Sequence, residues 1–272
     1  MLCYDLNGKN NGVILDDNWI IEPKLDGCRA MWHNQKLLMR NRNGNDNDLG
    51  IDRSDRFPQI VEALKGVEAT LDGEIVFLNE KGLPQFNLLL KKENWNRAIF
   101  FVFDIIDLNG DDVTKWKLEN RKMLLWNLFN PNLLNLPKNK DGSEYKIDSE
   151  FVKPLDICGY NLQIIENWKE QGMEGYVAKR KDGQYLKGLR SKYWCKKKFY
   201  KEMKVKILGL TEDKNHKSYG SMKTEYGDVG LLKMGNKIEY TQKTPKYVLV
   251  RYLEISDDGK FRFPTFIRFI YS

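Results

Sequence analysis

The chain has 272 residues, enough for one large domain or a medium-sized domain followed by a small one, and its hydrophobic content of 41% is typical of a soluble globular protein. The longest apolar stretch, residues 98–106, is too short to span a membrane and contains Asp104, so we expect no membrane partner. The first ten residues lack the pattern of a signal peptide, which predicts a cytoplasmic location, in a bacterium or in the host of a virus.

Charge and metal-ligating residues narrow the possible partners. The formal net charge is +7, and seven lysines fall within residues 192–206. This density favours a polyanionic partner, although a solvated basic face is the alternative. The four cysteines have no paired spacing and only two histidines are present, so neither a zinc site nor a disulfide framework is indicated. Any metal would be a hard cation bound by carboxylates.

Up to about residue 200 the predicted elements are helices mixed with strands. The first is a short helix over residues 54–66, with Ser54 or Asp55 as its cap and Pro58 in its first turn. The others are recognised by apolar spacing, β-prone composition and breakers. They are a strand and turn at 69–86, a buried strand at 96–107, helices at 118–130 and 161–172, and a strand at 173–180.

Past Lys201 the pattern changes to short alternating segments separated by turns, at 203–212, 235–242, 246–256 and 260–270. Roughly 70 residues remain there, about the size of a five-stranded barrel. The predicted fold class is therefore α+β. A domain over residues 1–200 combines antiparallel sheets and helices, and a small all-β domain over residues 201–272 follows it.

The stretch IEPKLDGCRA, residues 21–30, surrounds Lys24 with groups suited to chemistry. A lysine amine is ordinarily protonated at neutral pH, so Lys24 could act as a nucleophile only where its surroundings favour loss of the proton. Glu22 could accept hydrogen bonds, Gly27 would permit a tight turn, and Arg29 could bind phosphate oxygens. The alternative is a strand that ends in an ordinary turn.

Further polar residues occur at positions where a purely structural role would not require them. Glu74 in LDGEIVF and Glu174 in MEGYVAKR could together hold Mg²⁺ or Mn²⁺. Lys196 and Lys198 lie two residues apart, so on a strand they would share a face and could bind one polyphosphate. Together these residues predict a site with a reactive lysine, a bound metal ion and two lysines that bind phosphate.

The order of these motifs resembles that of the ATP-dependent DNA ligases, within the covalent nucleotidyltransferase superfamily. The matching motifs are EPKLDGCR, RNRNG, LDGEIVF, FFVFDII, MEGYVAK, WCKKKF and RFPTFIR. The resemblance implies an ATP-grasp-like adenylation domain followed by an OB-fold domain. It also implies that Lys24 attacks the α-phosphorus of ATP, that the AMP bound to Lys24 passes to the 5′-phosphate of nicked double-stranded DNA, and that the 3′-hydroxyl displaces it. We expect such an enzyme to be a monomer.

The resemblance assigns a role to each matching residue. Glu22 would read the adenine amine, and Phe103 would stack on the adenine, although an aromatic residue in an apolar run is more often part of a core. Glu74 would hold the ribose or the metal, and Glu174 would support the metal. The basic residues would bind phosphates: Arg29 and Arg42 those of the nucleotide and nick, Lys196 and Lys198 the α-phosphate, and Arg268 the leaving pyrophosphate. As an alternative, Arg268 is an ordinary outward-facing strand residue.

Three other functions stay open. An mRNA guanylyltransferase resembles the chain in Lys-x-Asp-Gly-x-Arg and a following OB domain, but Glu22 and RFPTFIR favour a ligase. An RNA ligase is disfavoured by Arg29. A catalytically inactive nick-binding module is disfavoured because the expected catalytic positions are all filled. The chain departs from the pattern at Ile270, where many relatives have another arginine.

Overall fold

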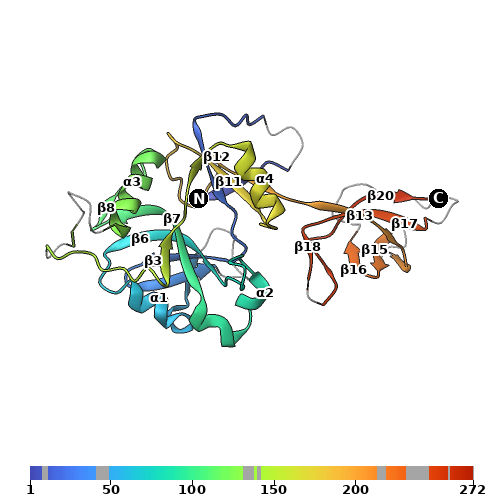
Figure 1. Ribbon diagram of the computed structural model, residues 1–272, viewed down its shortest axis with the longest axis horizontal. Helices are drawn as coiled ribbons and strands as arrows, with labels where there is room; N and C mark the ends of the chain where they lie inside the picture. The colour runs from blue at the N-terminus through green and yellow to red at the C-terminus, as the bar shows by residue number, and fades with distance from the viewer. Residues whose placement is uncertain are drawn as a thin grey trace. The chain divides into compact units, whose positions relative to one another are not determined.

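The computed structural model describes residues 1–7, 12–40, 49–130, 138–139, 142–212, 219–230, 245–256 and 258–271. The chain divides into two compact units, Met1–Lys197 and Lys198–Ser272 (Figure 1). Each unit has a hydrophobic core of its own. Within the described ranges, no helix is long and apolar enough to cross a membrane.

Two sheets form the frame of the amino-terminal unit. The larger sheet has the strand order β5-β4-β3-β6-β7-β8, with β9 also paired to β7. Its strands are antiparallel to their neighbours, except that β9 runs parallel to β7. The bounds are β3 Cys28–His33, β4 Lys36–Arg40, β5 Leu49–Asp52, β6 Ala69–Val76, β7 Ile99–Leu108, β8 Asp111–Asp112 and β9 Val152–Pro154.

The smaller sheet has the order β1-β12-β11-β2-β10. Strand β2 is antiparallel to β10 and β11, whereas β1 is parallel to β12. The chain leaves β2 directly into Lys24, so this sheet positions the predicted nucleophile. The bounds are β1 Leu2–Asp5, β2 Trp19–Pro23, β10 Cys158–Gly159, β11 Gly175–Arg180 and β12 Arg190–Lys198. The predicted combination of antiparallel sheets and helices is confirmed.

The helices contribute apolar side chains to the core of the larger sheet. Ile60, Leu89 and Leu125, each from a different helix, join the cluster that contains Phe100 and Leu71 of the sheet. Strand β7 is the buried strand expected at residues 96–107. The helix bounds are α1 Pro58–Ala63, α2 Phe86–Leu89, α3 Leu118–Phe129 and α4 Leu162–Glu170, with 3₁₀ helices η1 Ser54–Arg56 and η2 Lys92–Arg97.

The first predicted helix begins later than expected. Residues Ser54–Arg56 form a 3₁₀ turn, and α1 begins at Pro58 after an N-cap residue, Phe57, that provides no side-chain cap. The Ser54 hydroxyl accepts a hydrogen bond from the Leu37 amide at 3.0 Å and donates one to Asp52 at 2.6 Å. The predicted cap at Ser54 or Asp55 is therefore wrong, because the serine is used to attach this segment to β4.

The carboxy-terminal unit is made of short strands in three small sheets, β13-β17-β20, β14-β15-β16 and β18-β19. Val205, Met222, Val248 and Phe266 belong to its core. The expected strand at 235–242 lies outside the described residues. The described strands do not by themselves make one closed barrel, so the OB fold stays a prediction. Their bounds are β13 Lys201–Lys206, β14 Gly209–Glu212, β15 Tyr219–Thr224, β16 Gly227–Gly230, β17 Tyr247–Tyr252, β18 Glu254–Ile255, β19 Phe261–Arg262 and β20 Thr265–Ile270.

Candidate active site

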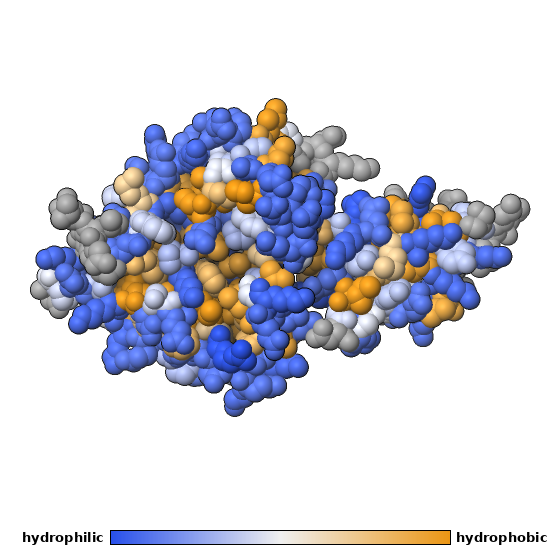
Figure 2. All heavy atoms as spheres, viewed as in Figure 1, coloured by the Kyte–Doolittle hydropathy of each residue, from blue (hydrophilic) through white to orange (hydrophobic). Residues whose placement is uncertain are grey.

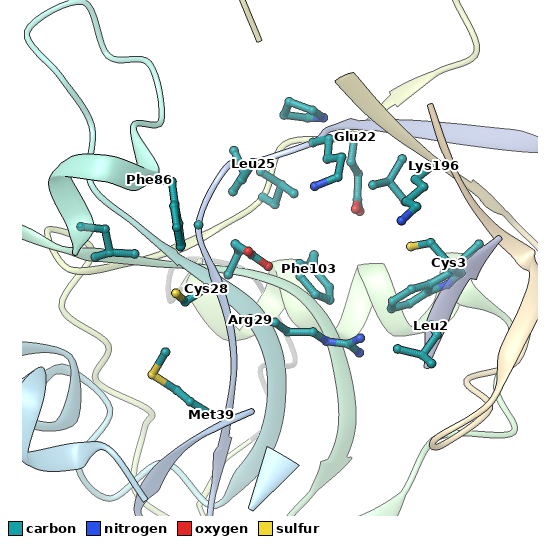
Figure 3. A pocket seen from close by; sticks show the side chains of 18 of the residues that line it. Leu2, Cys3, Glu22, Leu25, Cys28, Arg29, Met39, Phe86, Phe103 and Lys196 are labelled. Carbon is teal, nitrogen blue, oxygen red and sulfur yellow. The ribbon is translucent and has the colours of Figure 1, made fainter. Parts of the chain in front are cut away.

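A cavity of about 810 Å³ opens in the amino-terminal unit, lined by residues of both sheets (Figure 3). On the face shown in Figure 2, apolar side chains gather at the middle of this unit, and hydrophilic side chains surround them. The size suits a ligand as large as a nucleotide. Six of the residues predicted from the sequence line the cavity: Glu22, Lys24, Arg29, Glu74, Phe103 and Lys196.

Lys24 lies at the end of β2, where its amide donates a hydrogen bond to the Gly175 carbonyl at 2.9 Å. Its side-chain Nζ lies 2.6 Å from Glu174 Oε2. Burial disfavours the charged amine, but Glu174 and Glu74 outweigh burial, so the pKa of Lys24 is raised above its ordinary value. The amine is therefore held as an ammonium ion, and it can become a nucleophile only after losing a proton.

Gly27 is required by the close approach of its loop to β6. A Cβ atom at this position would lie 2.2 Å from the Ile75 carbonyl oxygen and 2.7 Å from Val76 Cγ1. Both contacts are shorter than van der Waals packing permits. The glycine thus lets the Lys24 loop lie flat against the strand that carries Glu74.

Glu74 is a half-buried carboxyl group beside Lys24. Burial, together with the like charges of Glu174 and Asp72, raises the pKa of Glu74 to about 7, although Lys24 and Arg29 oppose the shift. A divalent cation between Glu74 and Glu174 would relieve this repulsion, and two carboxylates plus ligand phosphates form a donor set that Mg²⁺ prefers. The two residues therefore fit the predicted metal, although no cluster of three metal-binding side chains occurs within the described part of the chain.

The raised pKa of Glu74 makes a prediction for folding stability in the absence of metal. The folded protein keeps the proton up to a pH of about 7, whereas the unfolded chain releases it near the ordinary value of 4.5. Stability contributed by Glu74 is thus lost as the pH rises through this interval, by up to about 3 kcal/mol. Glu74→Gln should therefore gain stability relative to wild type between pH 5 and pH 8. Urea denaturation in EDTA measures this difference, and a constant difference would contradict it.

Glu22 is enclosed by two lysine side chains rather than left free in the cavity. Its carboxylate pairs with Lys122 of α3 and, at 2.6 Å, with Lys179 of β11. The side chain is only 1% exposed. Burial lowers the pKa of Lys122 below its ordinary value, against the attraction of Glu22. Neither lysine was singled out from the sequence as part of the site.

Arg29 lines the cavity, but its guanidinium group is already engaged. Nε and Nη2 donate to the two oxygens of Asp72 at 2.9 and 2.6 Å, Nη1 donates to the Met1 carbonyl, and Nη2 lies 3.3 Å from the Tyr185 hydroxyl. Tyr185 in turn donates to Asp72 at 2.7 Å. Arg29 therefore presents a fixed positive charge to the cavity, and a phosphate would have to share its donors with Asp72.

Phe103 combines the two roles that the sequence left open. The half-buried ring lines the cavity, and it also packs against apolar clusters that contain Ile106 and Val76. The Trp194 ring meets it edge to face, with centroids 5.7 Å apart. Figure 3 shows the ring between Glu22 and Arg29.

The other predicted residues have different surroundings. Lys196 lines the cavity and its Nζ lies 3.9 Å from Asp5. Lys198 and Arg268 belong to the carboxy-terminal unit. There Lys198 lies over the Phe263 ring at 4.3 Å, and Arg268 is an exposed residue of β20. Arg42 lies outside the described residues.

Sequence reasoning missed three groups that shape the site: Asp72, Tyr185 and Lys179. A signal existed for Asp72, because it lies two residues before Glu74 on one strand and so shares its face. The two-residue period gave no such signal for Lys179, which lies on β11 five residues after Glu174 in the motif MEGYVAKR. No local signal identified Tyr185, since its partners Asp72 and Arg29 are more than 100 residues away.

Comparison with known proteins finds a similarity to DNA ligases and to DNA ligase-like proteins. The family described as "ATP dependent DNA ligase domain" matches residues 9–198. The multifunctional non-homologous end joining DNA repair protein LigD of Mycobacterium tuberculosis is 27% identical over 220 residues, which are 80% of this chain and 25% of LigD. The SPbeta prophage-derived DNA ligase-like protein LigB of Bacillus subtilis is 27% identical over 207 residues, which are 72% of this chain and 67% of LigB.

Solved structures show the same fold. A Lig E DNA ligase, from a study of "DNA binding with a minimal scaffold", has a TM-score of 0.65 at 20% identity and covers 99% of this chain and 98% of its own. The ligase domain of M. tuberculosis LigD has a TM-score of 0.55 at 22% identity, with 93% of this chain and 89% of that domain covered. The chain thus spans about a quarter of the whole LigD protein and nearly all of its ligase domain.

Proposed function

This chain belongs to the ATP-dependent DNA ligase domain family, and we propose that it seals nicks in double-stranded DNA as a monomer, using ATP. The single observation that carries the proposal is the position of Lys24. Its amine lies in a cavity of nucleotide size, paired with Glu174 and beside the half-buried carboxyl of Glu74. Its loop is supported by Gly27, where a Cβ atom would lie 2.2 Å from the Ile75 carbonyl oxygen.

In the proposed reaction Lys24 Nζ attacks the α-phosphorus of ATP, forming a phosphoramidate bond as pyrophosphate leaves. The AMP then passes to the 5′-phosphate of the nick, and the 3′-hydroxyl displaces it as the phosphodiester bond forms. Such transfers depend mainly on positioning and charge neutralisation. Glu74 and Glu174 would hold Mg²⁺, which neutralises phosphate charge when bound. Glu174, whose Oε2 lies 2.6 Å from Lys24 Nζ, would accept the proton that the ammonium group must lose before it attacks.

The remaining proposed roles follow the two units. The amino-terminal unit would be the adenylation domain, with Phe103 against the adenine and Lys196 at the α-phosphate. Lys198 and Arg268 of the carboxy-terminal unit would act on phosphates, and this unit would be the OB-fold domain. Arg268 is exposed on β20, which supports contact with a large polyanion.

Labelled nucleotides and nicked substrates test the proposal. The purified protein, incubated with Mg²⁺ and labelled ATP or GTP, should form a covalent adduct with AMP only, and it should seal a 5′-phosphorylated DNA nick. An adduct with GMP alone would instead indicate mRNA capping. Sealing of RNA nicks but not DNA nicks would indicate an RNA ligase. Binding of nicked DNA without any adduct would identify an inactive nick-binding module.

Gly27→Ala should slow formation of the lysyl-AMP adduct at least tenfold. The added methyl group displaces the Lys24 loop from β6, and a displacement of about 1 Å can reduce a positioned reaction about a hundredfold. Gly159→Ala is the matched control, since a Cβ there meets nothing within 4 Å. Adduct formation with labelled ATP is measured for both variants. A normal rate for Gly27→Ala would show that the loop tolerates the contact.

Binding to nicked DNA should weaken steeply as salt increases, because bound lysines displace counterions from the phosphates. Lys201, Lys204 and Lys206 are exposed along β13. Changing all three to glutamine should lower the slope of log K against log salt by about 3 if each contacts one phosphate. Fluorescence anisotropy from 50 to 300 mM NaCl measures the slope. An unchanged slope would remove this strand from the DNA contact surface.

A further inference from the structure

The hydroxyl group of Tyr185 lies beside Arg29 and uses all of its hydrogen-bonding capacity there. The Tyr185 side chain is buried, with only 4% of the residue exposed. Its hydroxyl donates to Asp72 Oδ2 at 2.7 Å, and it accepts from Arg29 Nη2 at 3.3 Å and from the Met1 nitrogen at 3.0 Å. A hydroxyl has one donor and two acceptor sites, so this one is fully engaged. Because Arg29 lines the cavity and Tyr185 is not among the described residues that do, any effect of Tyr185 on a ligand passes through Arg29.

The ionisation of the two acidic groups fixes the direction of these hydrogen bonds. Burial opposes the charge of Asp72, but the attraction of Arg29 outweighs burial, so the pKa of the Asp72 carboxyl is lowered. Burial, together with the charge of Asp72, raises the pKa of Tyr185 well above its ordinary value. At neutral pH Asp72 is therefore a carboxylate that accepts, and Tyr185 keeps its proton and donates it to Asp72.

These contacts leave Arg29 with little freedom and one unused donor. A guanidinium group has five N–H donors in one plane. Four of those of Arg29 have acceptors among the described residues: two bind the Asp72 oxygens, one binds the Tyr185 hydroxyl and one, on Nη1, binds the Met1 carbonyl. The second Nη1 donor is left for a ligand in the cavity. The direction of that donor is set by the acceptors that hold the plane of the group.

The aromatic ring of Tyr185 is held independently of its hydroxyl group. The Trp194 ring meets it edge to face, with centroids 5.5 Å apart and an angle of 83° between the planes. The guanidinium carbon of Arg121 lies 6.0 Å from the ring centroid. The Tyr185 amide donates to the Thr114 carbonyl at 2.9 Å. Tyr185→Phe therefore keeps the packing of the ring and removes only the hydroxyl group.

We propose that Tyr185 is a positioning residue: its hydroxyl group fixes the orientation in which Arg29 presents its remaining donor to a phosphate group in the cavity. The inference rests on the proposed function and adds a residue from outside the cavity to it. The phosphate belongs either to the nucleotide or to the nick, since both present anionic oxygens that a guanidinium group binds. Without the hydroxyl, Arg29 would keep its bonds to Asp72 but could turn away from the ligand.

Two single-turnover rates test the inference and distinguish the two phosphates. Formation of the lysyl-AMP adduct reports on the nucleotide, and sealing of a nick whose 5′-phosphate already carries AMP reports on the nick. Tyr185→Phe should lower at least one of these rates about tenfold, because a small misplacement slows a positioned reaction strongly. Arg29→Lys, which keeps a cation beside Asp72 but lacks the planar set of donors, should lower the same rate. In the Arg29→Lys background, adding Tyr185→Phe should change that rate less than about threefold, because the two residues act together.

Tyr145→Phe is the matched control. Tyr145 is also buried, at 7% exposure, and its hydroxyl donates to Asn109 Oδ1 at 2.7 Å. The same chemical change there, at a residue that is not among the described lining of the cavity, should keep both rates. Wild-type rates for Tyr185→Phe would overturn the inference. So would losses from Tyr185→Phe and Arg29→Lys that multiply in the double variant, since Tyr185 would then act independently of Arg29.

A binding measurement separates this inference from the proposed function. Wild-type protein that forms no adduct and seals no nick would overturn the ligase proposal. Isothermal titration calorimetry in EDTA would then compare the dissociation constants of adenosine and ATP, whose ratio measures the contribution of the phosphates. Tyr185→Phe should reduce this ratio at least about threefold, but not in the Arg29→Lys background. A ratio that Tyr185→Phe leaves unchanged would overturn the role of Tyr185, and normal ligation by the wild type with unchanged rates in Tyr185→Phe would overturn that role alone.

Discussion

Lys24→Ala should abolish both the protein–AMP adduct and the sealing of a 5′-phosphorylated nick, with a loss of at least about a thousandfold in rate. A covalent step cannot proceed without its nucleophile, and the two other lysines among the residues that line the cavity, Lys179 and Lys196, are paired with Glu22 and Asp5 rather than with Glu174. Labelled ATP followed by denaturing electrophoresis measures the adduct, and a labelled nick measures sealing.

Two companion variants distinguish loss of the nucleophile from loss of a positive charge and from a general effect of removing a lysine. Lys24→Arg keeps a cation opposite Glu174 but not a nucleophilic amine, so it should be equally inactive. Lys36→Ala removes a lysine that is 61% exposed and paired with Asp52 on the surface, and it should keep the wild-type rate. The Lys24→Ala protein should still seal a nick whose 5′-phosphate already carries AMP, because the last proposed step does not use the lysine. An adduct formed by Lys24→Ala would identify a different nucleophile.

Arg121→Met should lower the free energy of unfolding by about 3–5 kcal/mol, the range for removing one partner of a buried ion pair. Arg121 and Asp104 are both fully buried, and the guanidinium donates to the two Asp104 oxygens at 2.8 and 2.9 Å. It also donates to the carbonyls of Trp116 and Gly183. The variant would leave the Asp104 charge and these carbonyls without their donor. Chemical denaturation measures the loss.

An exposed pair and a double variant provide the controls. Arg180 and Asp182 form a similar two-bond pair near the surface, with side chains 40% and 52% exposed, so Arg180→Met should cost less than about 1 kcal/mol. The double variant Arg121→Met with Asp104→Leu should be more stable than Arg121→Met alone, because no charge is left buried. If Arg121→Met and Arg180→Met lower the free energy of unfolding by the same amount, burial is not the reason that the Arg121 pair stabilises the fold.

Features that depend on neighbouring residues could be predicted from the sequence. Helix α4 begins where Asn161 accepts hydrogen bonds from the amides of Gln163 and Ile164, and the chain leaves it through Gly172 in a left-handed conformation with φ of 86°. Strand β7 was recognisable because an apolar, β-prone run of this length is stable only inside a sheet. The residues around Lys24 and the later carboxylates and lysines likewise predicted a lysine, a metal site and phosphate-binding groups, and the resemblance to the DNA ligases implied nucleotidyl transfer.

Other features depend on which segments meet in space, and only the tertiary structure decided them. Ser54 looked like a helix cap, but the Leu37 amide of a neighbouring strand binds its hydroxyl, so α1 begins later. Arg29 looked free to bind phosphate, but Asp72 and Tyr185 already accept and share its donors. The two-residue period of a strand tells which face a side chain lies on, and it does not tell which group lies opposite.

The surroundings of Glu22 likewise depend on contacts between distant segments, which the sequence does not show. The sequence by itself determined that a carboxylate lies two residues before Lys24, the proposed nucleophile. Only the fold brought Lys122 of α3 and Lys179 of β11 onto that carboxylate, from positions about 100 and 157 residues further along the chain. Charge pairs of this kind form because burial leaves no water to solvate an ion, and the partner that replaces water is chosen by packing of distant segments rather than by local sequence.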